Sequence, residues 1–246
     1  MGGQPTRAEH EKRAIVGRRR RMACAGLVLA LLSTMPAVQS WAQAYPVKPI
    51  RLVVPFPPGG ANDIVARVIS PRLGEALGQS VVVENRGGAA GTIGADLVEK
   101  AAPDGYTLLM TPVPFVITQS LYPKLPYDGQ RDFVPVALLT SSSFVLAVGE
   151  KYAARSLQEP SVPRKQNRTA SRSRYGITAP RGTPAAIVGR LERELMAVLK
   201  APDVRDRLTA LGLEVTPMGS EEFGQFLRSQ HERWAELVSV SGAKPD

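Results

Sequence analysis

A glycine-rich turn between a predicted strand and a predicted helix is the feature of this sequence that best suits chemistry. Residues 50–54 are mostly apolar, residues 55–60 read PFPPGG, and a helical pattern begins at Asn62. A turn of this kind exposes backbone N–H groups at the positive end of a helix dipole. Because such groups bind anions, the turn is predicted to capture a carboxylate or a phosphate.

The individual residues of this turn suggest how a solute would be held. Gly59 and Gly60 lack a side chain, so the backbone can approach a carboxylate there, although plain turn glycines would look the same. Pro57 and Pro58 are expected to stiffen the turn and to reduce the entropy lost on binding. Phe56 is expected either to pack over the carbon chain of the solute or to belong to the core.

Two polar residues follow the glycines at the predicted helix start. Asn62 is expected to cap a helix that starts near Ile64, and Asp63 is expected to favour its positive end. Capping is favoured over ligand contact for Asp63, because an acid repels an anionic solute. Contact of Asp63 with an amino group or an ordered water stays open.

A second glycine-rich turn, residues 85–91 (NRGGAAG), follows the next predicted strand. Gly87 and Gly88 are expected to form a second backbone cradle, and Thr111, at the end of the third strand, either faces the same cleft or is solvated. Ligands of open α/β sheets bind at the carboxyl ends of parallel strands, where both turns lie. The glycine pattern is only a weak dinucleotide signal, because no acid with a ribose role follows about 20 residues on.

The elements that position these turns alternate along the chain. Strands are predicted at residues 50–54, 81–83, 107–111 and 144–148, with helical stripes between the first three. This alternation predicts an α/β fold with a parallel sheet and right-handed crossovers. The C-terminal part is predicted to be mainly helical, over residues 184–200, 203–211 and from Ser220 onward.

Residues 1–44 have the organisation of a secretory signal peptide. A positive block at residues 18–21 precedes an apolar stretch over residues 22–32, and Ala42-Gln43-Ala44 predicts cleavage after Ala44. The apolar stretch is too short to span a bilayer. Cys24 is the single cysteine of the chain, so the mature protein is expected to have no thiol chemistry. We therefore expect a soluble product outside the cytoplasmic membrane.

Charge and residue types exclude several functions. Of the net charge of +9, residues 1–44 contribute +5 and residues 151–175 contribute +6, so the remainder is slightly acidic and no broad nucleic-acid surface is indicated. His231 is the one histidine after residue 44, and no set of residues has zinc-ligand or catalytic-triad spacing. No catalytic residue, metal or cofactor is predicted.

Several segments occur in a characteristic order: YPVKPIRLVVPFPPGGANDIVAR (45–67), GQSVVVENRGGAAGTIGAD (78–96), APDGYTLLM (102–110), LYPKLPYDGQRDFVPVALL (121–139), YGITAPRGTPAAIV (175–188), and a helical tail through Trp234 to SGAKPD (241–246). Together they resemble the Bug family, the periplasmic solute receptors of tripartite tricarboxylate transporters. The resemblance implies a type II periplasmic-binding-protein-like clamshell of two domains that closes on a small carboxylate-bearing solute and is not an enzyme. It also implies a membrane permease as partner, with a sensor kinase ectodomain as a further candidate.

The chain departs from this family after residues 155–159. From there it passes through a basic segment to Tyr175 within about 15 residues. The resemblance implies most of a second domain at this place, so on the order of 80 residues are expected to be missing. The expected organisation is a signal peptide (1–44), an α/β domain I (45–148), a remnant of domain II with a basic linker (149–175), and a return strand with C-terminal helices (176–246).

The internal loss leaves three functions open. The favoured one is a carboxylate receptor weakened by a deletion or frameshift. The second is a remnant that no longer binds a solute. The third and least favoured is an α/β enzyme that uses the first glycine turn for a phosphate.

Overall fold

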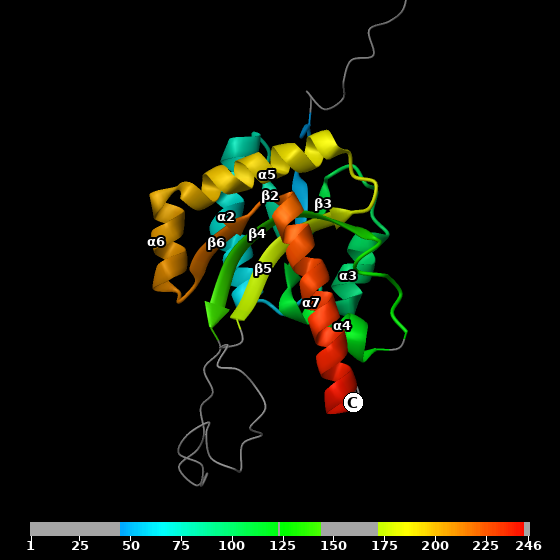
Figure 1. Cartoon of the computed structure of the whole chain (residues 1–246). Coiled ribbons are helices and arrows are strands. Elements are labelled where there is room, and N and C mark those ends of the chain that lie inside the picture. The colour runs from blue at the N-terminus through cyan, green and yellow to red at the C-terminus, as the bar shows by residue number, and fades with distance from the viewer. Residues whose placement is uncertain (1–44, 123, 144–171, 244–246) are drawn as a thin grey trace, which may run out of the picture. The chain divides into compact units, whose positions relative to one another are not determined.

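A six-stranded mixed sheet with the order β2-β1-β3-β5-β4-β6 forms the centre of the described part of the chain (Figure 1). The computed structural model describes residues 45–122, 124–143 and 172–243. The predicted signal peptide and the strand predicted at residues 144–148 lie outside these residues. Within them, no helix is both long and apolar enough to cross a bilayer.

The half of the sheet that carries the glycine turns is parallel, as the alternation of strands and helices predicts. Strand β1 pairs in parallel with β2 on one side and with β3 on the other. Leu52 and Val53 at the centre of β1 are fully buried on opposite faces, because helices cover both sides. The three strands are β1 (Ile50–Val54), β2 (Val81–Asn85) and β3 (Thr107–Pro112).

The other half of the sheet is antiparallel, unlike the expected parallel sheet, and it includes the return strand expected at the start of residues 176–246. It contains β4 (Phe133–Ser143), β5 (Arg172–Pro180) and β6 (Glu214–Met218). Strand β5 lies between β3 and β4 and is antiparallel to both, so the chain after residue 171 completes the sheet that begins at Ile50. The expected parallel sheet therefore describes β1 to β3 alone.

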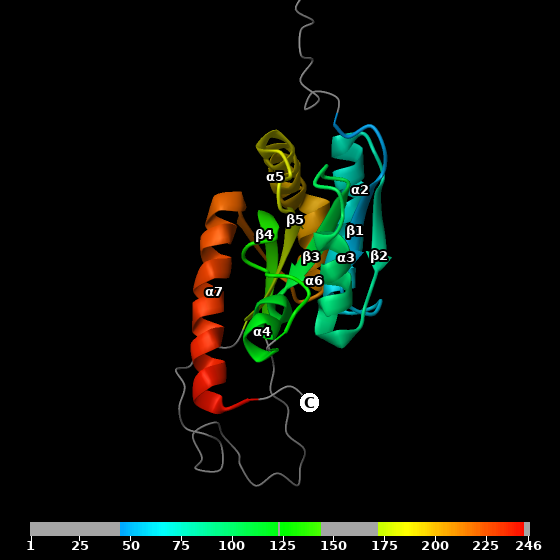
Figure 2. The ribbon, with the colours of Figure 1, turned by 90° about the vertical axis from the view of Figure 1, so that its right-hand side faces the viewer.

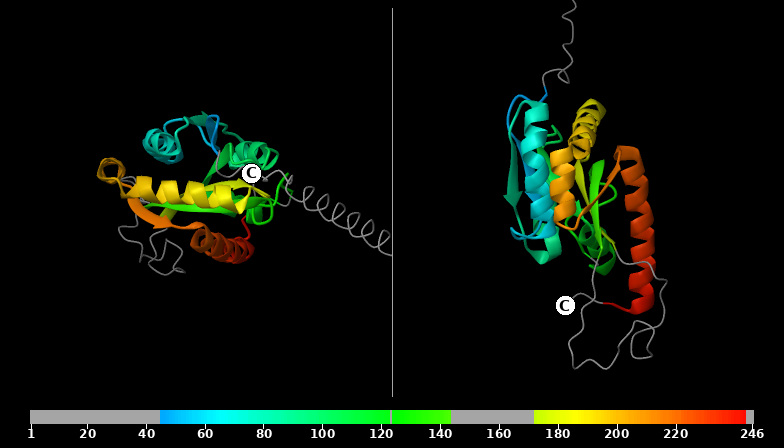
Figure 3. Two further views of the ribbon diagram at one scale, coloured as in Figure 1. Left: turned by 90° about the horizontal axis from the view of Figure 1, so that it is seen from above. Right: turned by 90° about the vertical axis from the view of Figure 1, so that its left-hand side faces the viewer.

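The helices cover the two faces of the sheet. One face packs against α2, α5 and α6, and the other against α3, α4 and α7. Figures 2 and 3 show α5 and α7 on opposite sides of β4 and β5. The helices are α2 (Ala61–Leu77), α3 (Thr92–Glu99), α4 (Val113–Leu121), α5 (Ala185–Lys200), α6 (Pro202–Ala210) and α7 (Ser220–Ser241).

The C-terminal helices follow the sequence pattern closely. Helix α5 begins one residue after Pro184, and α7 begins at Ser220, as predicted. The apolar stripe of α7 packs against the sheet rather than forming a separate surface, since Phe223 is 1% exposed and lies against Gly176 of β5. The core thus includes residues from both ends of the described chain.

Candidate functional site

Residues 55–60, here called the first glycine loop, connect β1 to α2 and leave helix N–H groups without acceptors. The first helical hydrogen bond runs from Ile64 N to Gly60 O at 3.0 Å. Among the described residues, none accepts a hydrogen bond from the N–H groups of Gly60, Ala61 or Asn62. The loop from Pro58 to Gly60 is exposed. The exposed helix N-terminus that the sequence predicted is therefore present.

The cap of α2 differs from the prediction. Gly60 is the N-cap residue, with extended φ and ψ of −78° and 167°, and no side chain caps from that position. Asn62, the predicted cap, lies inside the first turn. Asp63, the third residue of the helix, reaches back into the loop instead, and its Oδ2 accepts a hydrogen bond of 2.9 Å from Gly59 N–H. One of the predicted anion donors is thus occupied by the chain's own carboxylate.

The space beside the loop is open. Gly59 has a φ of +87°, which favours glycine, and no heavy atom lies within 4 Å of the position a Cβ would take. The nearest atom to such a position at Gly60 is Pro57 O at 3.8 Å. The Cα atoms of Gly59 and Gly60 are therefore uncovered on the side where a side chain would stand.

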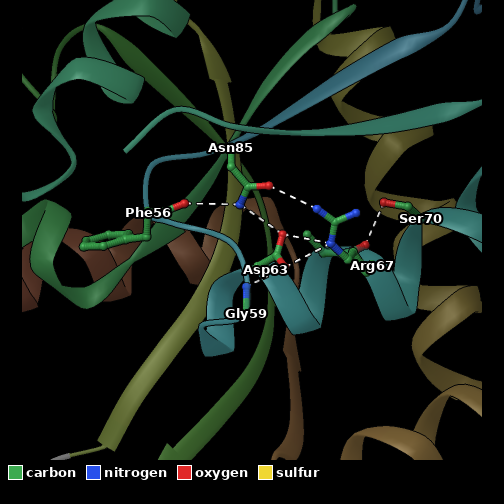
Figure 4. A network of polar contacts seen from close by, with 7 residues as sticks. Phe56, Gly59, Asp63, Arg67, Ser70 and Asn85 are labelled. Atoms are coloured by element: carbon green, nitrogen blue, oxygen red, sulfur yellow. Dashed lines mark hydrogen bonds and ion pairs between the residues drawn. The ribbon is translucent and has the colours of Figure 1, made fainter. Parts of the chain in front are cut away.

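Behind the loop, Asp63 is held in a network of polar contacts (Figure 4). Its side chain is 5% exposed, and both of its oxygens lie 3.0 Å from Arg67 Nε. Asn85 Nδ2 donates to Asp63 Oδ1 at 3.0 Å and to Phe56 O at 3.2 Å. Arg67 Nη2 in turn donates to Asn85 Oδ1 at 3.1 Å. The network joins the end of β2 to the first glycine loop and to α2.

These contacts explain why the carboxylate tolerates burial. The hydrogen bond from Arg67 is the largest influence and lowers the pKa of Asp63, and the bonds from Gly59 and Asn85 lower it further, against the opposing effect of burial. The sequence patterns did not predict that Arg67 and Asn85 belong to this site. The spacing of Asp63 and Arg67, four residues apart on a helix, was the signal available.

Residues 86–91, the second glycine loop, lie against the first. A Cβ at Gly87 would be 3.2 Å from Pro57, and one at Gly91 would be 3.4 Å from the ring of Phe56, which is half-buried. Parallel pairing of Val54 with Asn85 places both loops at the same edge of the sheet. The two loops therefore lie side by side.

The second loop also contains strained backbone. Ala89 and Ala90 have φ values of +46° and +53°, a left-handed conformation that costs an alanine about 1–2 kcal/mol per residue. Gly88 has a φ of +125°, and Ala89 and Ala90 are exposed. Strain of this kind persists where the surroundings impose it, often at binding sites.

Thr111 occupies a different environment from the glycine loops. Its side chain is buried at 2% exposure, and its Oγ1 lies 2.8 Å from Oγ1 of Thr178 on β5. The hydroxyl thus links β3 to β5 inside the sheet.

Within the described ranges, no group of three His, Cys, Asp or Glu side chains could hold a metal ion.

Comparisons with known proteins identify the class. Residues 65–169 and 154–242 match the family model described as Tripartite tricarboxylate transporter family receptor. A UPF0065 protein from the tcbD-tcbE intergenic region of Pseudomonas sp. (strain P51) is 30% identical over 321 aligned positions that span 92% of this chain and 95% of the relative. BugT of Bordetella pertussis is 42% identical over 140 residues, which are 56% of this chain and 42% of BugT.

Solved structures agree on the fold. The periplasmic binding protein BugD superposes with a TM-score of 0.70 at 24% identity, over 82% of this chain and 100% of BugD. MatC of Rhodopseudomonas palustris, solved with bound malate, gives a TM-score of 0.65 at 26% identity, over 79% of this chain and 100% of MatC. An R. palustris protein solved with adipate gives 0.72 at 21% identity, over 82% of this chain and 100% of that protein.

The fold is thus that of a periplasmic binding protein. Within that class, the chain belongs to the tripartite tricarboxylate transporter receptor family, as the sequence resemblance predicted. It is a member of a family of receptors, not the α/β phosphate-binding enzyme that the first glycine loop alone would have allowed.

Proposed function

We propose that the first glycine loop holds a carboxylate group of a small solute. The observation that carries this proposal is the set of N–H groups at Gly60, Ala61 and Asn62, which have no acceptor among the described residues and belong to an exposed loop and the helix turn that follows it. Donors of this kind at the positive end of α2 favour a negatively charged group without a charged side chain.

The other predicted residues divide into contact and support. Phe56 and Pro58, both in the first glycine loop, are proposed to contact the carbon chain of the solute. Gly87 and Gly88 are proposed to form the adjoining part of the same binding surface, since the second glycine loop packs against the first. Gly59 and Asp63 bond to each other and hold the loop in shape. Thr111, whose hydroxyl is shared with another strand, stays outside the proposed contact surface.

We further propose that most of the second clamshell domain is missing. Because 92% of 246 residues is about 226, about 95 of the 321 positions aligned with the Pseudomonas relative hold no residue of this chain. Strands β4 and β5 pair up to Ser143 and Arg172, and the 28 residues from 144 to 171 connect them. A segment of that length is too short for a domain with its own core. These facts support a remnant of domain II within the expected residues 149–175, of which residues 172–175 belong to β5 of the central sheet.

The loss of one wall should weaken binding. A small-molecule site normally buries roughly 70–90% of its ligand. When only domain I contacts the solute, the carboxylate stays partly hydrated. Its hydrogen bonds to the loop then replace hydrogen bonds to water, so they add little net binding free energy. A receptor of weak affinity and a remnant that binds nothing are therefore the two functions to be separated.

Calorimetry on the chain from Tyr45 onward tests this proposal. Malate and adipate, the ligands of two related structures, are the first solutes, followed by acidic amino acids. We expect dissociation constants of about 1 mM or weaker, or ~4 kcal/mol or less of binding free energy. A micromolar constant for a monomer would contradict the weakening. A folded protein without binding to any carboxylate would identify the remnant.

Export and transport partners complete the proposal. Cleavage after Ala44 would leave Tyr45 as the first residue, and Tyr45 is buried with its hydroxyl donating to Gly105 O at 2.7 Å. The folded part thus includes the first residue after the proposed cleavage site. N-terminal sequencing of the protein from the periplasm should begin at Tyr45. A membrane permease, and a sensor kinase ectodomain as a second candidate, are the partners we propose from the family.

A further inference from the structure

A buried negative charge lies directly behind the proposed carboxylate donors. Asp63 accepts a hydrogen bond from Gly59 N–H, and the next N–H along the chain, that of Gly60, is free. Neighbouring residues are ~3.8 Å apart, so an anion on Gly60 would be ~6 Å from the Asp63 carboxylate. An uncompensated charge there would repel the solute that the loop is proposed to bind.

We propose that Arg67 and Asn85 are positioning residues that make the first glycine loop able to accept an anion. This inference rests on the proposed function. Arg67 neutralises Asp63 through Nε, which lies 3.0 Å from both carboxylate oxygens. Because the ion pair neutralises Asp63, the positive end of the α2 dipole acts on an anion at the loop with almost no opposing negative charge.

Asn85 gives the network its geometry. Its Nδ2 bridges Asp63 Oδ1 and Phe56 O, and its Oδ1 accepts from Arg67 Nη2. It is also the last residue of β2, just before the second glycine loop. The amide thus fixes the spacing between the two glycine loops and orients Arg67 toward Asp63 (Figure 4).

The expected size of the charge effect follows from Coulomb's law. At ~6 Å, an unpaired Asp63 would repel a carboxylate enough to weaken its binding between about threefold, at the dielectric constant of water, and about 100-fold, at an effective value near 20. Arg67→Met keeps the length and apolar stem of the side chain while removing its charge, so it should produce a loss in this range.

A matched set of variants separates neutralisation from direct contact. Arg72→Met is the control, because Arg72 lies on the same helix and pairs with Glu75 and Asp203 instead. Asp63→Asn removes the charge but keeps an oxygen for Gly59 N–H. If Arg67 acts through Asp63, the double variant Arg67→Met/Asp63→Asn should bind malate within about threefold of the parent chain.

Two readouts are needed, both from amide NMR of the chain from Tyr45 to Asp246. Malate or adipate titrations followed at the Gly60 amide report affinity, and hydrogen exchange of the Gly59 amide without solute reports the network. We expect Arg67→Met to speed Gly59 exchange and weaken binding, Asn85→Ala to do both, and Arg72→Met to do neither.

The outcomes that oppose the inference are distinct from failure of the proposed function. If the double variant binds as weakly as Arg67→Met alone, Arg67 contacts the solute itself and the positioning role is wrong. If Gly59 exchange is unchanged in both Arg67→Met and Asn85→Ala, the network does not hold the loop. If the parent chain binds neither solute, the proposed function fails, while the exchange measurement still tests the network.

Discussion

A methyl group added at Gly94 tests whether α3 packs closely against both glycine loops. Gly94 lies on α3, and a Cβ there would be 2.7 Å from Arg86 O and 2.9 Å from Pro55 Cα. Both are backbone atoms, so no side-chain rotation relieves the overlap. Overpacking of this kind costs about 2–3 kcal/mol, and the better helix propensity of alanine returns about 1 kcal/mol. Gly94→Ala should therefore lower the free energy of unfolding by about 1–2 kcal/mol.

The assay is thermal and urea unfolding followed by far-ultraviolet circular dichroism, with Gly189→Ala as the control. Gly189 lies on α5, where the nearest atom to an added Cβ is Arg193 Nη1 at 3.8 Å, so its variant should gain up to about 1 kcal/mol. Gly94→Ala should lower Tm by about 2–8 °C, since 1 kcal/mol shifts Tm by about 2–4 °C at this size. An equal rise in Tm for both variants would refute the close contact between α3 and the first glycine loop.

Three further predictions concern the pH dependence and the core. Because Arg67 lowers the pKa of Asp63 below its value in the unfolded chain, the Asp63 carboxylate stabilises the fold fully above about pH 4. This stabilisation is lost as the pH falls through the lower pKa of the folded state. Urea unfolding at a series of pH values should show the loss of stability, and the loss should be smaller in Asp63→Asn. Thr111→Val should cost about 1–3 kcal/mol by leaving the Thr178 hydroxyl unpaired, and adding Thr178→Val should recover part of that loss in the same unfolding assay. Phe223→Ala should cost about 3–5 kcal/mol, measured by chemical denaturation, and a loss below about 1 kcal/mol would show that α7 is not held by this side chain.

The parts of the fold that the sequence predicts are those with local signals. The apolar run at residues 50–54 marks β1, and the glycines after it mark the turn into α2. The predicted N-cap residue of α2, Asn62, was wrong. Asparagine is a good N-cap residue in general, but here the extended backbone of Gly60 makes Gly60 the N-cap residue, and Asp63 bonds back to Gly59.

The parts that the sequence does not predict depend on contacts between distant residues. Strand β5 enters the sheet between β3 and β4, and no local pattern specifies that neighbour. Thr111 finds its hydroxyl partner in Thr178, 67 residues later. Asn85 looks like an ordinary turn residue until parallel pairing places it beside the first glycine loop. Long-range pairing therefore turns the predicted loops into a defined site.

The central claim, that the N–H groups of the first glycine loop hold a carboxylate, is tested most directly by mapping amide chemical shifts during titration with adipate and malate. We predict shifts at Gly60, Ala61 and Asn62 that saturate in the millimolar range, or ~4 kcal/mol of binding free energy, with smaller shifts in the second glycine loop. Unchanged amides in the first loop of a folded protein, or shifts confined to other parts of the chain, would contradict the account.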